Sequence, residues 1–181
     1  MFYCEIVTAA EAFELSIKGG ATDFARVISA CESLGPYCLI GGLAVNCFVE
    51  PVYTLDADLV LVSESLASVS AYLKCDGFLL ESYPNSLNAK RPGSELRVQF
   101  TTDPRYQIFL ARAEDREVLG LRVKVACLED VVRGKMWAYS DPERRLSKRK
   151  KDELDLIRLA EAYPSLRALY PPELSRQLGE T

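Results

Sequence analysis

Two aspartates, Asp56 and Asp58, are the residues of this sequence whose types and spacing best suit chemistry. Only Ala57 separates them, and the segment Leu55–Val62 around them reads as a β-strand, so both side chains project from the same face. Two carboxylates this close repel each other unless a cation lies between them, and a divalent metal is a natural choice. The pair therefore predicts a metal site. A solvated strand end is the structural alternative.

The absence of histidine narrows the chemistry further. The 181 residues contain no histidine, which excludes Ser-His-Asp triads, histidine-assisted cysteine nucleophiles and most zinc sites. The remaining chemistry must use carboxylates, lysine, arginine and a metal that prefers oxygen ligands. We therefore expect Mg²⁺ or Mn²⁺ at Asp56 and Asp58.

The composition is that of one globular domain, or of one domain with a small appendage. The chain is 49% hydrophobic and 27% charged, has no apolar run long enough to span a bilayer, and begins without a secretion signal. We therefore expect a soluble cytoplasmic protein that has no contact with a membrane. Its six cysteines form no C-x-x-C pair and are expected to be reduced.

Charge is distributed unevenly along the chain. Residues 1–90 carry a net charge of −7 and residues 91–181 a net charge of +3, which together give the overall −4. The acidic half contains the aspartate pair, and the basic half contains a cluster of six cations, Arg144, Arg145, Lys148, Arg149, Lys150 and Lys151. A metal site opposite anion-binding charge suits a phosphate-rich substrate. A solvated basic helix face explains the cluster equally well.

A glycine pair, Gly41-Gly42, precedes the aspartates. It lies between the apolar run Tyr37–Ile40 and a short predicted helix, Leu43–Val49, and residues 43–55 separate it from Asp56. Glycines allow a tight turn and a close backbone approach to a ligand, and the N-terminus of the following helix offers N–H groups to an anion. Taken alone, such a pair is more often a simple turn.

The elements that position these residues follow from periodicity. Apolar residues on both faces of the 55–62 strand predict a place in the middle of a sheet. We expect helices at 5–17, 22–34 and from Ser63 or Ser65 to Asp76, further strands at 78–82, 95–100, 107–110 and 118–125 in hairpins or a meander, and a loop at 83–94. Helices are expected from Leu128 and over 148–163, followed by a polar tail from Tyr170.

The ordered motifs resemble a known enzyme superfamily. Ile40-Gly41-Gly42, a short helix and Thr54–Leu59, with its Asp-x-Asp, are similar to the signature of the nucleotidyltransferase superfamily. Leu128-Glu129-Asp130 leading to Lys135, and then Arg149–Asp152 and Asp155, resemble the AbiEii-type nucleotidyltransferase toxins and their MenT-type relatives. The resemblance extends over roughly residues 37–160.

The resemblance implies a fold, a reaction and partners. The fold would be α+β, a mixed sheet flanked by helices (1–127) with a helical C-terminal part (128–181) that closes a nucleotide cleft. Asp56 and Asp58 would hold Mg²⁺, Gly41 and Gly42 would face the triphosphate, Lys135 would contact phosphates, and Asp152 would be a further acidic residue of the site. The nucleotide of an NTP would pass to a hydroxyl acceptor, often a tRNA 3′ end in these toxins, and an antitoxin protein would be the partner. Other superfamily members modify proteins or small antibiotics.

Two departures from the family pattern bear on activity. Many superfamily members carry a third acid on a later strand, and the corresponding strand, Leu96–Phe100, has Gln99 at that position. A neutral amide is no general base and is a poor Mg²⁺ ligand. In addition, residues 51–54 lack the arginine that these toxins often place before the aspartate pair. Asp152 could supply the missing acid; otherwise the chain could be a non-catalytic nucleotide- or RNA-binding module on the same fold.

Structural alternatives stand beside these functional interpretations. A lone lysine such as Lys135 is usually a surface residue, and Gly134 beside it predicts a close approach of a ligand or another backbone unless it is merely tolerated. The acids of the second C-terminal helix could simply form i,i+4 pairs, Lys148–Asp152, Arg149–Glu153 and Lys151–Asp155. A scaffold role would be favoured if arginines paired with Asp56 and Asp58 in a closed surface.

Overall fold

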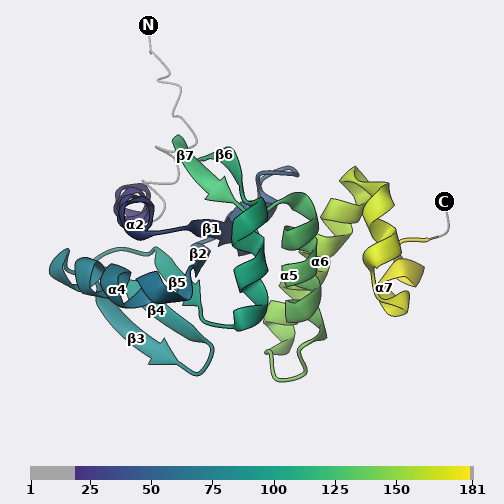
Figure 1. The fold of residues 1–181 in the computed structure, drawn as a ribbon. Coiled ribbons are helices and arrows are strands. Elements are labelled where there is room, and N and C mark those ends of the chain that lie inside the picture. The colour runs from purple at the N-terminus through teal and green to yellow at the C-terminus, as the bar shows by residue number, and fades with distance from the viewer. Residues whose placement is uncertain (1–18, 180–181) are drawn as a thin grey trace, which may run out of the picture.

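The computed structural model of this protein describes residues 19–179 and contains a seven-stranded mixed sheet in the order β3-β4-β5-β2-β1-β7-β6 (Figure 1). The strands are β1 (Tyr37–Ile40), β2 (Asp56–Leu61), β3 (Leu79–Tyr83), β4 (Ser86–Lys90), β5 (Arg97–Thr101), β6 (Glu114–Val118) and β7 (Leu121–Val125). The helices are α2 (Gly20–Leu34), α3 (Gly41–Val45), α4 (Leu66–Cys75), α5 (Leu128–Ser140), α6 (Leu146–Ala162) and α7 (Pro172–Gln177), with 3₁₀ segments η1 (Ser63–Ser65), η2 (Pro104–Arg112) and η3 (Pro164–Leu169).

The strand carrying the aspartates lies in the middle of this sheet. β2 pairs antiparallel with β1 and parallel with β5, and β1 pairs parallel with β7. The predicted α+β class, a mixed sheet flanked by helices with a helical C-terminal part, is confirmed, and so is the central position of β2. The predicted helix at 5–17 lies outside the described residues.

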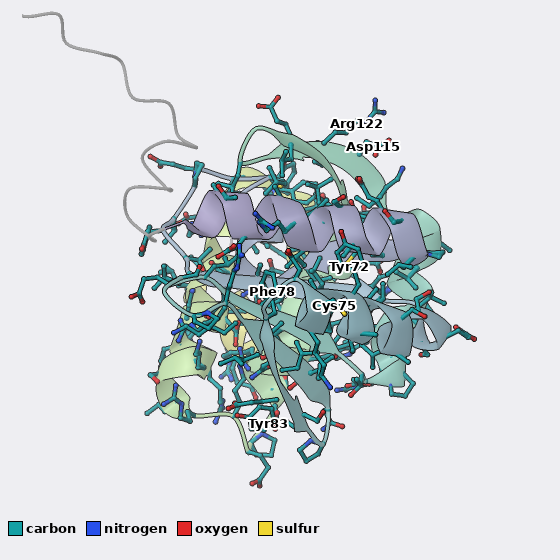
Figure 2. The ribbon with its side chains drawn as sticks, turned by 90° about the vertical axis from the view of Figure 1, so that its left-hand side faces the viewer. Tyr72, Cys75, Phe78, Tyr83, Asp115 and Arg122 are labelled. Carbon is teal, nitrogen blue, oxygen red and sulfur yellow. The ribbon has the colours of Figure 1, made fainter. Side chains whose placement is uncertain are left out.

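The two faces of the sheet differ in character. Ala57 and Leu59 of β2 are fully buried in one core with Phe24 of α2 and Leu73 of α4, because period-2 alternation turns them to the same side. Figure 1 shows α2 and α4 on one side of the central strands and α5 and α6 on the other, and Figure 2 looks onto the α2–α4 side. The opposite face of β2 carries Asp56 and Asp58, so the acids face the C-terminal helices.

Several boundaries differ from those that the sequence predicts. The 83–94 segment contains strand β4, which pairs with β3 through a two-residue turn between Tyr83 and Ser86. The predicted strand at 107–110 is wrong: it belongs to the 3₁₀ segment η2, which begins at Pro104 after Asp103, whose carboxylate accepts a hydrogen bond from the Arg105 N–H. The 118–125 segment is the turn and second strand of the β6–β7 hairpin, on which Figure 2 labels the ion-paired Asp115 and Arg122. Helix α3 begins at Gly41, two residues earlier than expected.

The C-terminal tail packs against the rest of the molecule and is not a polar extension. Tyr170 and Leu174 are buried, and the Tyr170 hydroxyl donates a hydrogen bond of 2.8 Å to the Leu156 carbonyl of α6. This contact fixes the end of the chain to the helix that faces the sheet. Within the described part of the chain, no helix has both the length and the apolar character that crossing a membrane requires.

Candidate functional site

Two adjoining cavities lie between the polar face of the sheet and helices α5 and α6. They have volumes of about 110 and 340 Å³ and share the lining residues Asp58, Gln99, Lys135, Arg144 and Asp152. All the residues that the sequence singles out for chemistry line one cavity or both: Gly41, Gly42, Asp56, Asp58, Lys135 and Asp152. Residues from four separate parts of the chain therefore meet in one cleft.

The carboxylate of Asp58, which lines this cleft, has no direct partner among the described residues. It makes no hydrogen bond or ion pair with any residue between 19 and 179, although it is partly buried. Burial raises the pKa of its carboxyl; the charge of Lys135 opposes this rise, and the neighbouring Asp56 adds to it. A carboxylate in this state is ready to receive a cation.

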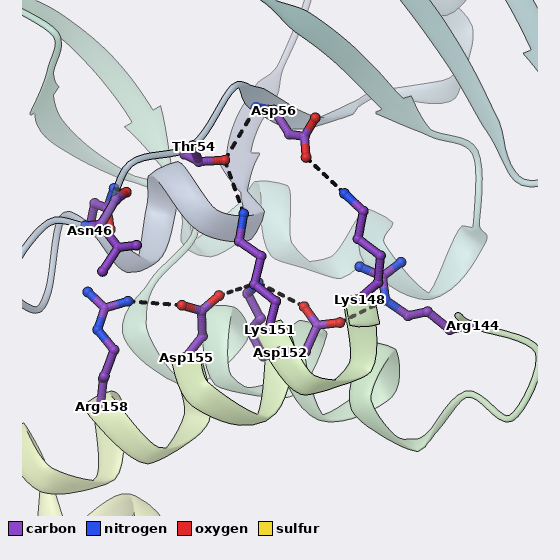
Figure 3. Close-up of polar contacts among 11 residues, drawn as sticks. Asn46, Thr54, Asp56, Arg144, Lys148, Lys151, Asp152, Asp155 and Arg158 are labelled. Carbon is purple, nitrogen blue, oxygen red and sulfur yellow. Dashed lines mark hydrogen bonds and ion pairs between the residues drawn. The ribbon is translucent and has the colours of Figure 1, made fainter. Parts of the chain in front are cut away.

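The carboxylate of Asp56, unlike that of Asp58, contacts two cationic side chains. Its Oδ1 lies 2.8 Å from Arg97 Nε, and its Oδ2 accepts a hydrogen bond of 3.0 Å from Lys148 Nζ (Figure 3). Arg97 is the cross-strand partner of Asp56 on β5, so a neighbouring strand places an arginine beside the pair although residues 51–54 have none. The condition for a scaffold role is therefore met by Asp56 alone, and both acids line an open cavity.

Gly41 is required by its contact with Asp58. It adopts φ +70°, and a Cβ added there would lie 2.0 Å from Asp58 Oδ2 and 2.8 Å from its Cγ. The backbone at the start of α3 thus lies directly against the Asp58 carboxylate, and this side chain, rather than a ligand, is the neighbour that requires glycine here. At Gly42 a Cβ would lie no closer than 3.6 Å to Thr54, so this position has ordinary room.

We expect Gly41→Ala to damage the site while leaving the rest of the fold intact. The added methyl group must displace Asp58, and a non-glycine residue at this φ is strained, so the free energy of unfolding should fall by about 1–3 kcal/mol. Urea unfolding of Gly41→Ala measures this change. Gly93→Ala is a matched control, because Gly93 has φ +85° and no atom within 4 Å of an added Cβ; an equal loss in both variants would show that backbone strain alone is responsible.

Lys135 is buried between two acids of α6. Its Nζ lies 2.9 Å from Asp152 Oδ1 and 2.7 Å from Asp155 Oδ2, and only 7% of the residue is exposed. Burial lowers the pKa of this ammonium, but Asp155 and Asp152 raise it by more, so the net pKa lies above its ordinary value and the charge is retained. Asp152 also pairs with Arg144 at 2.7 Å, and Asp155 with Arg158 at 2.9 Å (Figure 3).

These contacts replace the i,i+4 pairs expected within α6. Lys148 and Lys151 reach across the cleft to the sheet: Lys148 contacts Asp56, and Lys151 donates to Thr54 Oγ1 at 3.4 Å (Figure 3). Arg149 donates to the Tyr139 carbonyl, while Glu153 pairs with Lys150. The basic cluster is thus divided: part of it lines the cleft, and the solvated-face interpretation holds for Arg145 and Lys150, which are exposed.

Gln99 stands at the position where many nucleotidyltransferases carry a third acid, and Asp152 is the candidate to replace that acid. Gln99 pairs in register with Asp58 across β2 and β5 and lines both cavities, so an amide lies on the strand beside the carboxylate. Asp152 has one oxygen bonded to Lys135 and the other to Arg144. It is therefore occupied in this structure. At Gly134, which lines the smaller cavity, a Cβ would meet the Tyr106 ring at 3.2 Å, so the close neighbour seen there is an aromatic side chain and not another backbone.

The carboxylates of Asp56 and Asp58 suit a metal whose other ligands are waters or substrate phosphates. No group of three or more His, Cys, Asp or Glu residues within 19–179 is arranged to enclose an ion, so a metal here would need ligands beyond the Asp56 and Asp58 carboxylates. Mg²⁺ is commonly bound by one or two carboxylates together with waters and substrate phosphates. The Asp58 carboxylate meets that requirement, and Asp56 does so once a cation releases one of its oxygens.

The fold occurs in solved structures although no family model and no curated protein matches the sequence. The lincosamide antibiotic adenylyltransferase LnuA, bound to lincomycin, superposes with a TM-score of 0.55 at 12% identity, covering 78% of this chain and 96% of LnuA. The antibiotic-resistance factor ANT(2″)-Ia gives 0.54 at 16% identity, covering 82% and 91%. A nucleotidyltransferase-like antigenic protein from Paracoccidioides brasiliensis gives 0.51 at 21% identity, covering 86% and 90%. At these identities the likeness establishes a nucleotidyltransferase-like fold.

Proposed function

We propose that this protein is a metal-dependent nucleotidyltransferase, which moves a nucleotide from an NTP to a hydroxyl acceptor and releases pyrophosphate. One observation carries the proposal: the Asp58 carboxylate, without a direct partner among the described residues, lies beside Asp56 and against the Gly41 backbone in a cleft whose opposite wall is cationic. This arrangement provides a place for a divalent ion and, facing it, charge that suits a triphosphate.

Each part of the cleft has a proposed role. Asp56 and Asp58 hold Mg²⁺ or Mn²⁺, and Gly41 and Gly42 allow the triphosphate to approach the backbone closely. We assign Lys135 two functions, since its charge acts on Asp58 and its contacts hold α6 in place. Residues 1–127 then form the catalytic core, and residues 128–181 close the cleft.

The reaction is an in-line displacement at the α-phosphorus. The acceptor oxygen forms a bond to the α-phosphorus, the bond from that phosphorus to the bridging oxygen breaks, and pyrophosphate leaves with the bonding electrons. The proton of the acceptor hydroxyl is released to solvent. A bound metal would offset the negative charge that develops on the phosphates. Gln99 accepts no proton, so in this chain its amide can only orient the acceptor hydroxyl.

Two acceptor classes follow from different observations. The resemblance to AbiEii-type and MenT-type toxins favours a tRNA 3′ end, a toxin role with an antitoxin partner, and action in the cytoplasm. The antibiotic adenylyltransferases of the same fold favour a small hydroxylated molecule. Arg144, Lys148 and Lys151 in the cleft suit the phosphates of RNA, so we place tRNA first.

Label transfer tests this proposal. The protein is incubated with each α-³²P-labelled NTP, with Mg²⁺ or Mn²⁺, and with total tRNA or a panel of hydroxylated antibiotics. We expect one NTP to label an acceptor, EDTA to abolish labelling, and Asp56→Asn to reduce it by at least about 10²-fold. Asp115→Asn, at an exposed ion pair on β6, removes the same charge outside the cleft and should change nothing. Labelling that survives Asp56→Asn would refute the site.

Gln99 supports the alternative of a non-catalytic nucleotide- or RNA-binding module. Calorimetry with NTP and Mg²⁺ separates the two functions. Binding without transfer to any acceptor favours the module, whereas the absence of NTP binding contradicts both.

A further inference from the structure

The ion pairs of Asp56 with Arg97 and Lys148 affect how a metal ion can bind in the cleft. Both of its carboxylate oxygens are engaged, Oδ1 by Arg97 and Oδ2 by Lys148, whereas Asp58 beside it has no such partner among the described residues. Taken together, these two acids and two cations carry no net charge. A divalent ion that enters alone therefore meets a neutral set of side chains instead of two free carboxylates, and its attraction is correspondingly weak.

The two cations are placed so that they can change partners. Their side chains are 57% and 35% exposed, for Arg97 and Lys148 respectively, so both are hydrated and free to rotate at the mouth of the cleft. Arg97 comes from strand β5, and Lys148 comes from helix α6 on the opposite wall. A triphosphate arriving between these walls carries more negative charge than the single Asp56 carboxylate, so its oxygens attract both cations more strongly.

We propose that Arg97 and Lys148 make metal binding conditional on the nucleotide. In the free protein they neutralise Asp56; when a nucleoside triphosphate enters with its metal, they transfer to its phosphate oxygens and release Asp56 to the metal. The inference rests on the proposed function and adds the order in which metal and nucleotide bind. Metal and triphosphate bind together, and the metal alone binds weakly. The same two residues thereby exclude free divalent ions and recognise the triphosphate.

The exchange predicts opposite effects of one substitution on two ligands, the metal alone and the metal with a nucleotide. The variants are Arg97→Gln and Lys148→Gln, and Arg145→Gln is the matched control, because Arg145 is exposed next to α6 and does not line the cleft. Mn²⁺ binding without nucleotide is measured by electron paramagnetic resonance. Binding of the α,β-methylene analogues of ATP, GTP, CTP and UTP, each with Mn²⁺, is measured by calorimetry.

We expect either substitution to tighten binding of Mn²⁺ alone by about three- to tenfold, and to weaken binding of the preferred analogue by about tenfold. Arg145→Gln should leave both affinities unchanged. Unchanged or weaker Mn²⁺ binding in both variants, with analogue binding by the unaltered protein intact, would overturn this inference and leave the proposed function standing. If the unaltered protein binds no analogue, the proposed function and this inference both fail.

Discussion

Asp58→Asn is expected to abolish nucleotidyl transfer and at the same time to make the protein more stable. The carboxylate of Asp58 is the charge that a metal would need, so its loss should reduce transfer by about 10²–10³-fold. The same carboxylate is partly buried without a partner among residues 19–179, and an isosteric amide removes that unfavourable charge. The free energy of unfolding at pH 7 should rise by about 1 kcal/mol.

The dependence of stability on pH checks the cause. The pKa of Asp58 is raised in the folded state above its ordinary value of 3.8, so the folded protein binds the proton more tightly than the unfolded chain does. Stability from this group is therefore fully present below the unfolded pKa and is lost as pH rises through the folded pKa. The advantage of Asp58→Asn should accordingly shrink as pH falls toward 3.8.

Urea unfolding from pH 4 to pH 7 measures this difference. Asp115→Asn serves as the control with the opposite sign, because Arg122, then Lys124, lower the pKa of Asp115 and its replacement removes a favourable interaction. A loss of stability in Asp58→Asn at pH 7 would mean that Asp58 has a favourable partner in solution, which would contradict this interpretation of the site.

Lys135→Ala is expected to have the largest effect on stability. It removes the ammonium that Asp152 and Asp155 share and leaves two buried carboxylates with fewer cations, which should lower the free energy of unfolding by about 3–5 kcal/mol. Lys150→Ala is the matched control on the exposed side of α6, where Lys150 pairs with Glu153. Its loss should change stability by less than about 1 kcal/mol.

This prediction affects how activity data on Lys135 are interpreted. A loss of transfer in Lys135→Ala would arise from displacement of α6 even if the ammonium never touched a phosphate. Adding Asp152→Asn and Asp155→Asn to Lys135→Ala removes the two buried carboxylates, which then have only Arg144 and Arg158 as cationic partners, and should recover part of the stability. If Lys135→Ala alone lies within about 1 kcal/mol of the unaltered protein, the buried network is not what holds α6 in place.

The central part of the fold could be predicted because local signals there agree. The apolar pattern of 55–62 indicates a central strand, which is where the structure places β2. The strand at 86–90 was missed because only Leu87 and Ala89 face inward, a pattern too short to stand out from a Pro- and Gly-containing loop. Pro and Asn are both common turn residues, so Pro84-Asn85 is the signal that could identify a turn between two strands here.

The ion-pair partners of the charged site residues were harder to predict from the sequence than the strands and helices that carry them. The i,i+4 rule considers a helix alone, whereas Lys148 finds a partner on β2, Lys151 finds one in the segment just before β2, and Asp152 finds one on α5. Arg97 was overlooked because its importance depends on parallel pairing of β2 with β5, which places it beside Asp56. Alternation along Leu96–Phe100 does put Arg97 on the same face as Gln99, but which strand lies next to β2 is a tertiary fact.

The strand order determines when, during synthesis on the ribosome, each strand can find its neighbours in the sheet. β1 lies between β2 and β7, and its register with β7, Leu39 opposite Val125, joins segments far apart in the chain. A nascent chain that ends before β7 leaves one edge of β1 open. Lys148 follows later still, so Asp56 is synthesised long before the helix that neutralises it from across the cleft. The five strands of residues 37–101 can pair with one another as they are made, but the β1 edge and the charge on Asp56 must wait for the C-terminal half of the chain.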